Sequence, residues 1–153
     1  MKTFYDEKPS EISIERVNGS AIIRFTENPM EIVDNEDGSR LWECDEYVLK
    51  LRDRAGIEEH VKENFAKFFE YAKEDERAKL ADAVRLKRDI LLKESDPEMC
   101  IDRFVGPDIT AKIENALNGE WAAYRQALRD IPKQAGFPYN VVFPKKPNKG
   151  GTE

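Results

Sequence analysis

The chain has 153 residues, of which 40% are hydrophobic and 37% are charged, and its formal net charge is −6. This length suits one domain or one domain with a small module, and the acidic balance argues against a dedicated nucleic-acid-binding protein. The sequence has no apolar run long enough to cross a membrane and no signal-peptide pattern, and Cys44 and Cys100 are too few for a disulfide framework, so we expect a reduced, cytoplasmic protein.

Residues 1–53 are predicted to form an antiparallel β-meander of about four strands. Asn18-Gly19 is a strong hairpin signal, because both central residues of a type I′ turn need a positive φ. A two-residue loop at this point places Ile14 directly opposite Ile23. One face of the hairpin is then apolar and the other mostly polar, as a half-buried sheet requires.

Two further strands are predicted to follow this hairpin. Asn28-Pro29 should end its second strand, and residues 30–33 and 41–51 should form the next two strands. The turn-rich sequence DNEDGS joins them. The last run is long for one strand, so we expect a bend near its Asp-Glu pair at 45–46.

Residues 54–144 are predicted to form a helical hairpin or bundle of two to four helices, which makes the fold α+β. Apolar side chains follow helical spacing over residues 57–72 and again over residues 80–91. The charged sequence KEDER between them contains no helix breaker, so one long helix and two helices both remain open. Pro97 should end this run, because it disfavours the α conformation of the residue before it.

A third apolar stripe covers residues 109–131. It passes through Asn118-Gly119, where we expect a kinked helix or two short collinear helices. The Pro-rich sequence that follows is predicted to be extended, and residues 145–153, with three lysines and one glutamate, should form a flexible basic tail.

Charge is distributed unevenly along the chain. Residues 1–53 hold 7 basic and 13 acidic residues, residues 54–130 hold 14 and 17, and residues 131–153 hold 4 and 1. The net charge of the β module therefore equals that of the whole chain. The helical residues are dense in charge but close to balance, as expected for paired Arg–Asp contacts between helices.

No sequence pattern points to a catalytic centre, a metal site or a cofactor. His60, the one histidine, lies in a helical pattern and should be a partly exposed surface residue. Residues 34–38 resemble a calcium loop, but the first and twelfth loop positions would be Val33 and Cys44, so the match fails. Phosphate loops and metalloprotease motifs are absent from the sequence. We therefore expect no enzyme activity, no cofactor and no metal.

The most unusual sequence is WAAYRQALRDIPKQAGFPYNVVFP, which covers residues 121–144. Trp121, Tyr124 and Leu128 share one helix face. Ile131-Pro132 should then end the helix, and the Gly-Phe-Pro sequence at 136–138 should turn the chain.

Arg125 and Arg129 lie one turn apart on the adjacent helix face and repel each other slightly. Each is therefore expected to have a carboxylate partner, which the planar guanidinium can bind with two hydrogen bonds. The candidates are Asp130 in the same segment and, if the preceding helix packs antiparallel, Asp89 and Asp96. Together with Arg88, these last two are the candidates for pairing between the helices.

Two sequence blocks together resemble the phage tail assembly chaperone family, whose signature runs K-R-D-x-L-L-x-x-S-D, a spacer, then W-x-x-Y-R-Q-A-L-R-D-I-P-x-Q-x-G-F-P and a closing W-P. The first block is matched by Lys87, Arg88, Asp89, Leu91, Leu92, Ser95 and Asp96. The second is matched by Trp121, Tyr124, Arg125, Gln126, Ala127, Leu128, Arg129, Asp130, Ile131, Pro132, Gln134, Gly136, Phe137 and Pro138. The resemblance covers roughly residues 84–144. It departs from the signature at Pro97, at Phe143-Pro144 and in a long spacer before the second block.

The resemblance implies a non-catalytic phage or prophage protein that assists tail assembly in the host cell by binding tail proteins. Our hypothesis is that Trp121, Tyr124, Arg125 and Phe137 form or border the binding surface, because aromatic residues and arginine dominate contact energies. A wholly buried ring could not serve in this way, and the motif residues would then be core. The alternative function is a structural tail or tail-fibre component retained in the virion. Self-association through sheet edges or the long helix stays open.

Overall fold

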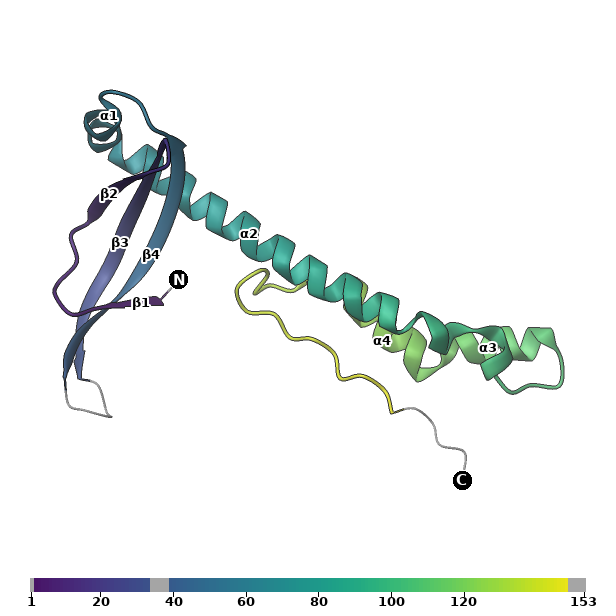
Figure 1. Cartoon of the computed structure of the whole chain (residues 1–153). Coiled ribbons are helices and arrows are strands. Elements are labelled where there is room, and N and C mark those ends of the chain that lie inside the picture. The colour runs from purple at the N-terminus through teal and green to yellow at the C-terminus, as the bar shows by residue number, and fades with distance from the viewer. Residues whose placement is uncertain (1, 34–38, 149–153) are drawn as a thin grey trace. The chain divides into compact units, whose positions relative to one another are not determined.

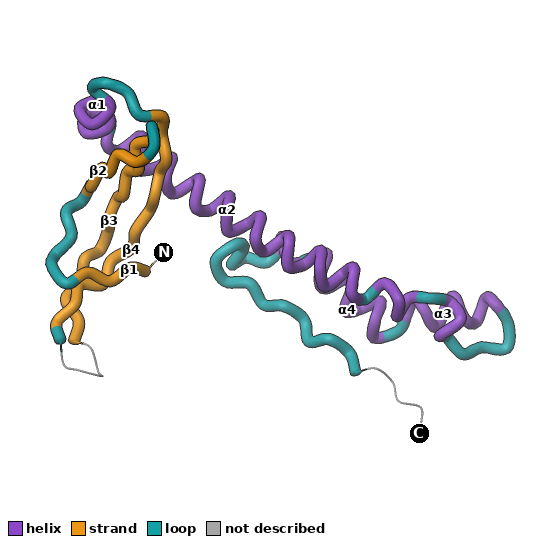
Figure 2. The backbone as a smooth tube through the Cα atoms, in the orientation of Figure 1, coloured by secondary structure: helices purple, strands orange, loops and turns teal. Residues whose placement is uncertain are grey.

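The computed structural model describes residues 2–33 and 39–148. The chain divides into two compact units, unit 1 (Met1–Ala78) and unit 2 (Lys79–Glu153). Figure 1 labels the strands and helices, and Figure 2 separates helix, strand and loop along the chain. The predicted α+β fold, an antiparallel sheet followed by helices, is confirmed.

Unit 1 contains a four-stranded antiparallel sheet. Its strands are β1 (Lys2–Tyr5), β2 (Ile12–Val17), β3 (Ser20–Val33) and β4 (Arg40–Arg52), in the order β1-β4-β3-β2. The hairpin prediction is confirmed: Asn18 and Gly19 have φ of 48° and 73°, and Ile14 pairs with Ile23. Figure 1 shows β3 and β4 as the two long central strands.

The prediction that Asn28-Pro29 ends a strand is wrong. β3 continues to Val33, and its register passes from Glu27 opposite Asp45 to Met30 opposite Glu43. The two intervening residues therefore form a bulge, in which Asn28 adopts a φ of 53°. Asparagine tolerates this left-handed conformation, and a bulge accommodates the missing proline N–H.

Three further details differ from the sequence prediction of the sheet or lie beyond it. The irregularity expected near residues 45–46 lies on β3 instead, and β4 is continuous. β1, a four-residue edge strand paired with β4, was not anticipated, because so short a run shows little alternation. The acidic turn predicted at 34–38 lies outside the described residues.

The core of unit 1 forms where helical residues cover one face of the sheet. Ala21, Ile23 and Phe25 on β3 are fully buried against Ile57 and Val61 of α1 (Ile57–Glu63). Two phenylalanines pack against Phe25: its ring lies 5.5 Å from that of Phe65 and 5.4 Å from that of Phe69. Both of these partners lie at the start of α2 (Phe65–Glu94).

The helical residues of unit 1 form two helices, and the break between them lies before the charged sequence KEDER. α1 ends before Asn64, whose side-chain amide donates to the His60 carbonyl oxygen at 2.9 Å. The charged sequence KEDER lies inside α2 and does not interrupt it. His60 is exposed, as expected, with its ring 5.5 Å from that of Phe68.

Unit 2 contains the end of α2 and two shorter helices, α3 (Ile109–Asn118) and α4 (Glu120–Arg129). α2 ends at Glu94, before the predicted stop, and a 3₁₀ turn follows at Asp96–Met99. Asp108 caps α3 by accepting a hydrogen bond from the Ala111 amide at 2.9 Å. Gly119 separates α3 from α4, which confirms the predicted break.

Candidate functional site

The apolar face of α4 forms the core of unit 2. Leu128 and Ile131 are 0% exposed and Tyr124 is 4% exposed. Partly buried side chains surround them: Val84, Leu91 and Leu92 of α2, and Trp121, Phe137, Val141 and Phe143. The predicted helix face therefore points into the core, and the Tyr124 ring is not available as a contact surface.

The Arg125 side chain reaches from α4 to the end of α2. Its Nη1 donates to the Leu92 carbonyl oxygen at 2.9 Å, to Ser95 Oγ at 2.6 Å and to Asp96 Oδ1 at 2.7 Å. Ser95 is fully buried, and its hydroxyl donates to the same Leu92 carbonyl oxygen at 2.6 Å. We call these four residues the Arg125 clamp.

The Arg125 clamp places a cation at a helix C-terminus. The last carbonyl groups of a helix lack intrahelical partners, and the helix dipole favours positive charge there. The Arg125 side chain is only 16% exposed, whereas the Asp96 side chain is 61% exposed. The hydrogen bonds to the part-buried chain end therefore contribute more than the exposed ion pair.

Of the three carboxylates expected to pair with the motif arginines, Asp96 contacts Arg125. Asp89 instead pairs with its neighbour Arg88, with 2.7 Å between Nη2 and Oδ1. Both residues of this pair belong to α2, and the Asp89 side chain is 57% exposed. The contact that the structure records for Arg88 and Asp89 joins them to each other on one helix, so their pairing between helices stays a prediction.

Asp130 also has partners other than the arginines. It accepts hydrogen bonds from Lys133 Nζ at 2.7 Å and from Gln126 Nε2 at 3.0 Å. These two donors, Lys133 first, hold the pKa of the Asp130 carboxyl below its usual value. Arg129 is exposed, and within residues 2–33 and 39–148 its guanidinium has no hydrogen bond or ion pair, contrary to the expected carboxylate partner.

The helix ends and the chain turns after α4, as predicted. Ile131-Pro132 begins a 3₁₀ turn, Ile131–Lys133. Gly136 follows, where a Cβ atom would collide with the Asn140 carbonyl oxygen. The next bond, Phe137-Pro138, is cis; Pro138 is buried, and the Phe137 ring lies 5.5 Å from the Arg85 guanidinium carbon.

The residues beyond this turn run back along unit 2 in extended form. Gln134 binds Val142 through two hydrogen bonds, from its Nε2 to the carbonyl oxygen at 2.8 Å and from the Val142 amide to its Oε1 at 2.9 Å. The Lys87 ammonium lies 4.3 Å from the Phe143 ring centre. A side-chain amide thus pairs with the backbone as a neighbouring strand would.

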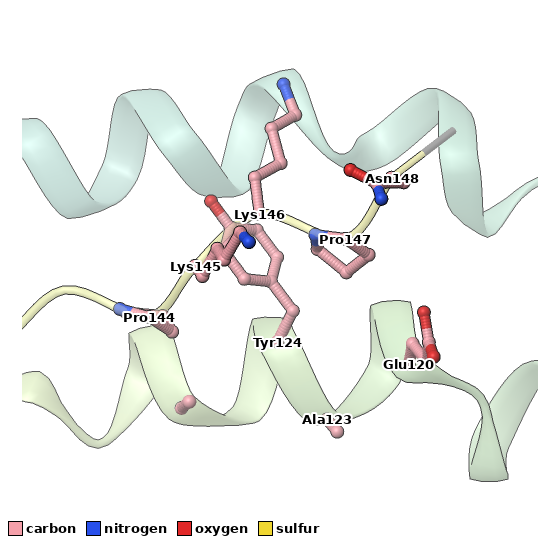
Figure 3. A pocket seen from close by; sticks show the side chains of 9 residues that line it. Glu120, Ala123, Tyr124, Pro144, Lys145, Lys146, Pro147 and Asn148 are labelled. Atoms are coloured by element: carbon pink, nitrogen blue, oxygen red, sulfur yellow. The ribbon is translucent and has the colours of Figure 1, made fainter. Parts of the chain in front are cut away.

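A cavity of about 470 Å³ lies between α4 and this C-terminal segment. Figure 3 shows Tyr124 rising from α4 toward the segment, while Lys146 extends from the segment away from α4. The Lys146 ammonium lies 3.5 Å from Glu94 Oε2 at the end of α2. Two prolines and two alanines share the remaining wall with three polar residues, Glu120, Lys145 and Asn148.

Sequence reasoning did not single out the roles of Ser95 and Gln134. Both belong to the matched sequence blocks, but neither is charged or aromatic, so nothing in residue type marked them as contacts. Among the described residues, no group of three or more His, Cys, Asp or Glu side chains could hold a metal ion. No described helix is both long and apolar enough to cross a membrane.

Comparison with known proteins gives one match. Residues 81–148 match the sequence model of the phage tail assembly chaperone protein family, which confirms the resemblance drawn from the two sequence blocks. The matched range covers nearly all of unit 2 and includes the Arg125 clamp, the turn at Gly136 and the Gln134 contact. Neither the curated proteins nor the solved structures contain a match to this chain.

Proposed function

We propose, on the premise that residues 81–148 form a phage tail assembly chaperone segment, that this protein binds a tail protein in the host cell and assists its assembly without catalysing a reaction. The family match is the observation that carries the proposal, and it supports a role in phage tail assembly. Binding of a tail protein is the simplest way for a chaperone to act, because its contacts keep an unassembled partner from associating incorrectly.

The motif residues divide into two groups in this proposal. Tyr124, Leu128 and Ile131 are core and hold α4 in place. Arg125 acts inside the protein through the Arg125 clamp, so it positions the surface rather than contacts the client directly. Pro138 is also buried. The remaining motif residues are Trp121, Gln126, Arg129, Asp130, Pro132, Gly136 and Phe137, and we propose that their exposed atoms border the client surface.

Exposed apolar side chains of unit 2 support a binding role. Ile109, Ile113 and Leu117 on α3 are 60%, 46% and 68% exposed, and Val105 is 84% exposed. Concentrated apolar exposure of this kind is typical of protein interaction sites. The proposed client surface therefore includes apolar residues that precede the motif in the sequence.

Co-expression tests this function. Each tail protein encoded beside the gene is expressed alone, with this chain, and with a Leu128→Ala variant whose unit 2 core is weakened. We expect at least one tail protein to become soluble only with the wild-type chain and to co-purify with it. If no tail protein depends on the chain for solubility, the proposal is wrong.

The alternative role, a structural component of the tail, makes a different prediction. Mass spectrometry of purified virions would then find the chain at a fixed copy number per particle. A chaperone leaves the particle, so we expect the chain in lysates and not in virions.

A further inference from the structure

One side of α3 presents an apolar stripe that the described residues leave uncovered. Ile109, Ile113 and Leu117 follow one another at intervals of four residues, so they lie on the same side of the helix. Each keeps nearly half or more of its surface exposed. The stripe leads directly to the junction with α4, because Leu117 precedes the helix break at Gly119 by two residues.

Leu117 also lines a groove of about 430 Å³ on the surface of α4. Three small residues, Gly119, Ala122 and Ala123, also line this groove. A Cβ atom on Gly119 would approach the Asn115 carbonyl oxygen to 3.0 Å, so a larger residue would be crowded at the helix junction. Met99 adds an apolar wall.

The charged side chains that line this groove are both arginines, Arg125 and Arg129. Arg125 is engaged in its clamp with Asp96. The guanidinium of Arg129 has no ion pair or hydrogen bond in the described parts of the chain. The nearest acid in sequence, Asp130, is already bound to Lys133 and Gln126. The groove therefore carries one uncompensated positive charge beside an apolar stripe.

We infer that the stripe and the groove together bind an amphipathic helix of the client, with aliphatic side chains on the stripe and a carboxylate on Arg129. Helix recognition of this kind uses apolar anchors spaced three or four residues apart, which the spacing of Ile109, Ile113 and Leu117 matches. The small side chains of Gly119, Ala122 and Ala123 leave room for a helix backbone. A client carboxylate would neutralise the charge of Arg129. This inference rests on the proposed function and specifies the chemistry of its client.

Overlapping synthetic peptides covering the tail proteins encoded beside the gene provide the probe. The purified full-length protein is applied to the peptide array, and each bound peptide is then measured in solution by fluorescence anisotropy. We expect the bound peptides to combine aliphatic residues at i and i+4 with an acidic residue, and we expect replacement of that acid by its amide to weaken binding several-fold.

Two pairs of variants locate the binding site. Arg129→Glu should weaken binding of an acidic peptide about fivefold or more, the effect of an ion pair of about 1 kcal/mol, and a peptide with lysine in place of the acid should recover that loss. Lys145→Glu makes the same charge change on an exposed lysine outside the groove and should have less effect. Leu117→Ala should also weaken binding, whereas Leu86→Ala, on an equally exposed leucine of α2, should not.

Several results would overturn the inference. The first is an equal effect of Arg129→Glu and Lys145→Glu, and the second is a set of bound peptides without an acid requirement. The third is a dimer of the chain that Leu117→Ala dissociates. A chain that keeps a tail protein soluble but binds no peptide in this groove would refute the inference and leave the proposed function standing. Failure of the co-expression experiment would instead refute the function itself.

Discussion

Replacement of Arg125 by methionine tests whether the Arg125 clamp stabilises unit 2. Methionine keeps the aliphatic length of the side chain but removes all three guanidinium hydrogen bonds. The buried Ser95 hydroxyl then loses a charged donor, while its own bond to the Leu92 carbonyl remains. The change therefore isolates what the guanidinium contributes.

The expected cost follows from the burial of the three acceptors. A hydrogen bond from a charged donor in a part-buried site contributes about 1.5–3 kcal/mol, whereas the exposed Asp96 carboxylate contributes at most about 1 kcal/mol. Contributions that share one donor are not additive. We expect Arg125→Met to lower the free energy of unfolding of unit 2 by about 2–4 kcal/mol.

Denaturant unfolding followed by Trp121 fluorescence measures this effect. Trp121 lies one turn before Arg125 in α4, and a Trp42→Phe background removes the signal from β4 of unit 1. Arg129→Met is the matched control, because it removes an exposed arginine from the same helix and should cost no more than about 0.5 kcal/mol. Asp96→Asn should cost about 1 kcal/mol or less.

Two outcomes would refute this reasoning. If Arg125→Met and Arg129→Met have equal effects, the contacts of the clamp contribute nothing to the stability of unit 2. If Asp96→Asn costs as much as Arg125→Met, the exposed ion pair dominates, and the buried serine and helix end are incidental.

Three further predictions concern other contacts. Gln134→Ala should release the C-terminal segment, because the side-chain amide of Gln134 holds the backbone of Val142. The expected signs are faster hydrogen exchange of the Val142 N–H and faster tryptic cleavage after the lysines that follow Val142. Unchanged exchange would contradict this role of the Gln134 side chain. Leu128→Ala should lower the free energy of unfolding by about 2–5 kcal/mol, because the side chain is fully buried. Leu117→Ala, at an exposed position, should lower it by about 0.5 kcal/mol or less. Equal losses of stability in the two variants would show that Leu128 is not a core residue. Burial and a hydrogen bond to a carboxylate raise the pKa of Tyr5 from its ordinary value near 10 to about 12. The folded state therefore keeps this proton to higher pH than the unfolded state, and the free energy of unfolding should fall as pH rises from about 10 to about 12. Tyr5→Phe should lack this fall, and an identical loss of stability at alkaline pH in the variant would refute the role of Tyr5.

The sheet shows what local sequence can predict. The hairpin register followed from Asn18-Gly19 alone, because a two-residue turn leaves only one pairing. The continuation of β3 through Asn28-Pro29 did not follow, since the same two residues suit both a strand end and a bulge. The choice depends on whether β4 offers partners beyond that point, which is information from another segment.

The candidate site shows the same limit. Periodicity identified the face of α4 that carries Tyr124 and Leu128, but it could not say whether this face binds a client or fills a core. Three carboxylates were available to Arg125, and Asp96 is the partner because the chain turns at the end of α2 and brings it to α4. That Arg129 lacks an acidic partner among the described residues could be seen only once the structure had shown which residues bind Asp89, Asp96 and Asp130.

The acidic β module remains separate from these conclusions. The family match begins at residue 81, so it covers none of the sheet. Residues 1–53 carry the whole net charge of the chain, and an acidic surface favours basic partners and disfavours nucleic acid.

The fraction of particles with complete tails, counted by electron microscopy after deletion of the gene, tests the central claim most directly. A role in tail assembly predicts that this fraction falls sharply in the deletion and recovers when the wild-type chain is supplied in trans. An unchanged fraction of complete tails in the deletion would contradict the account.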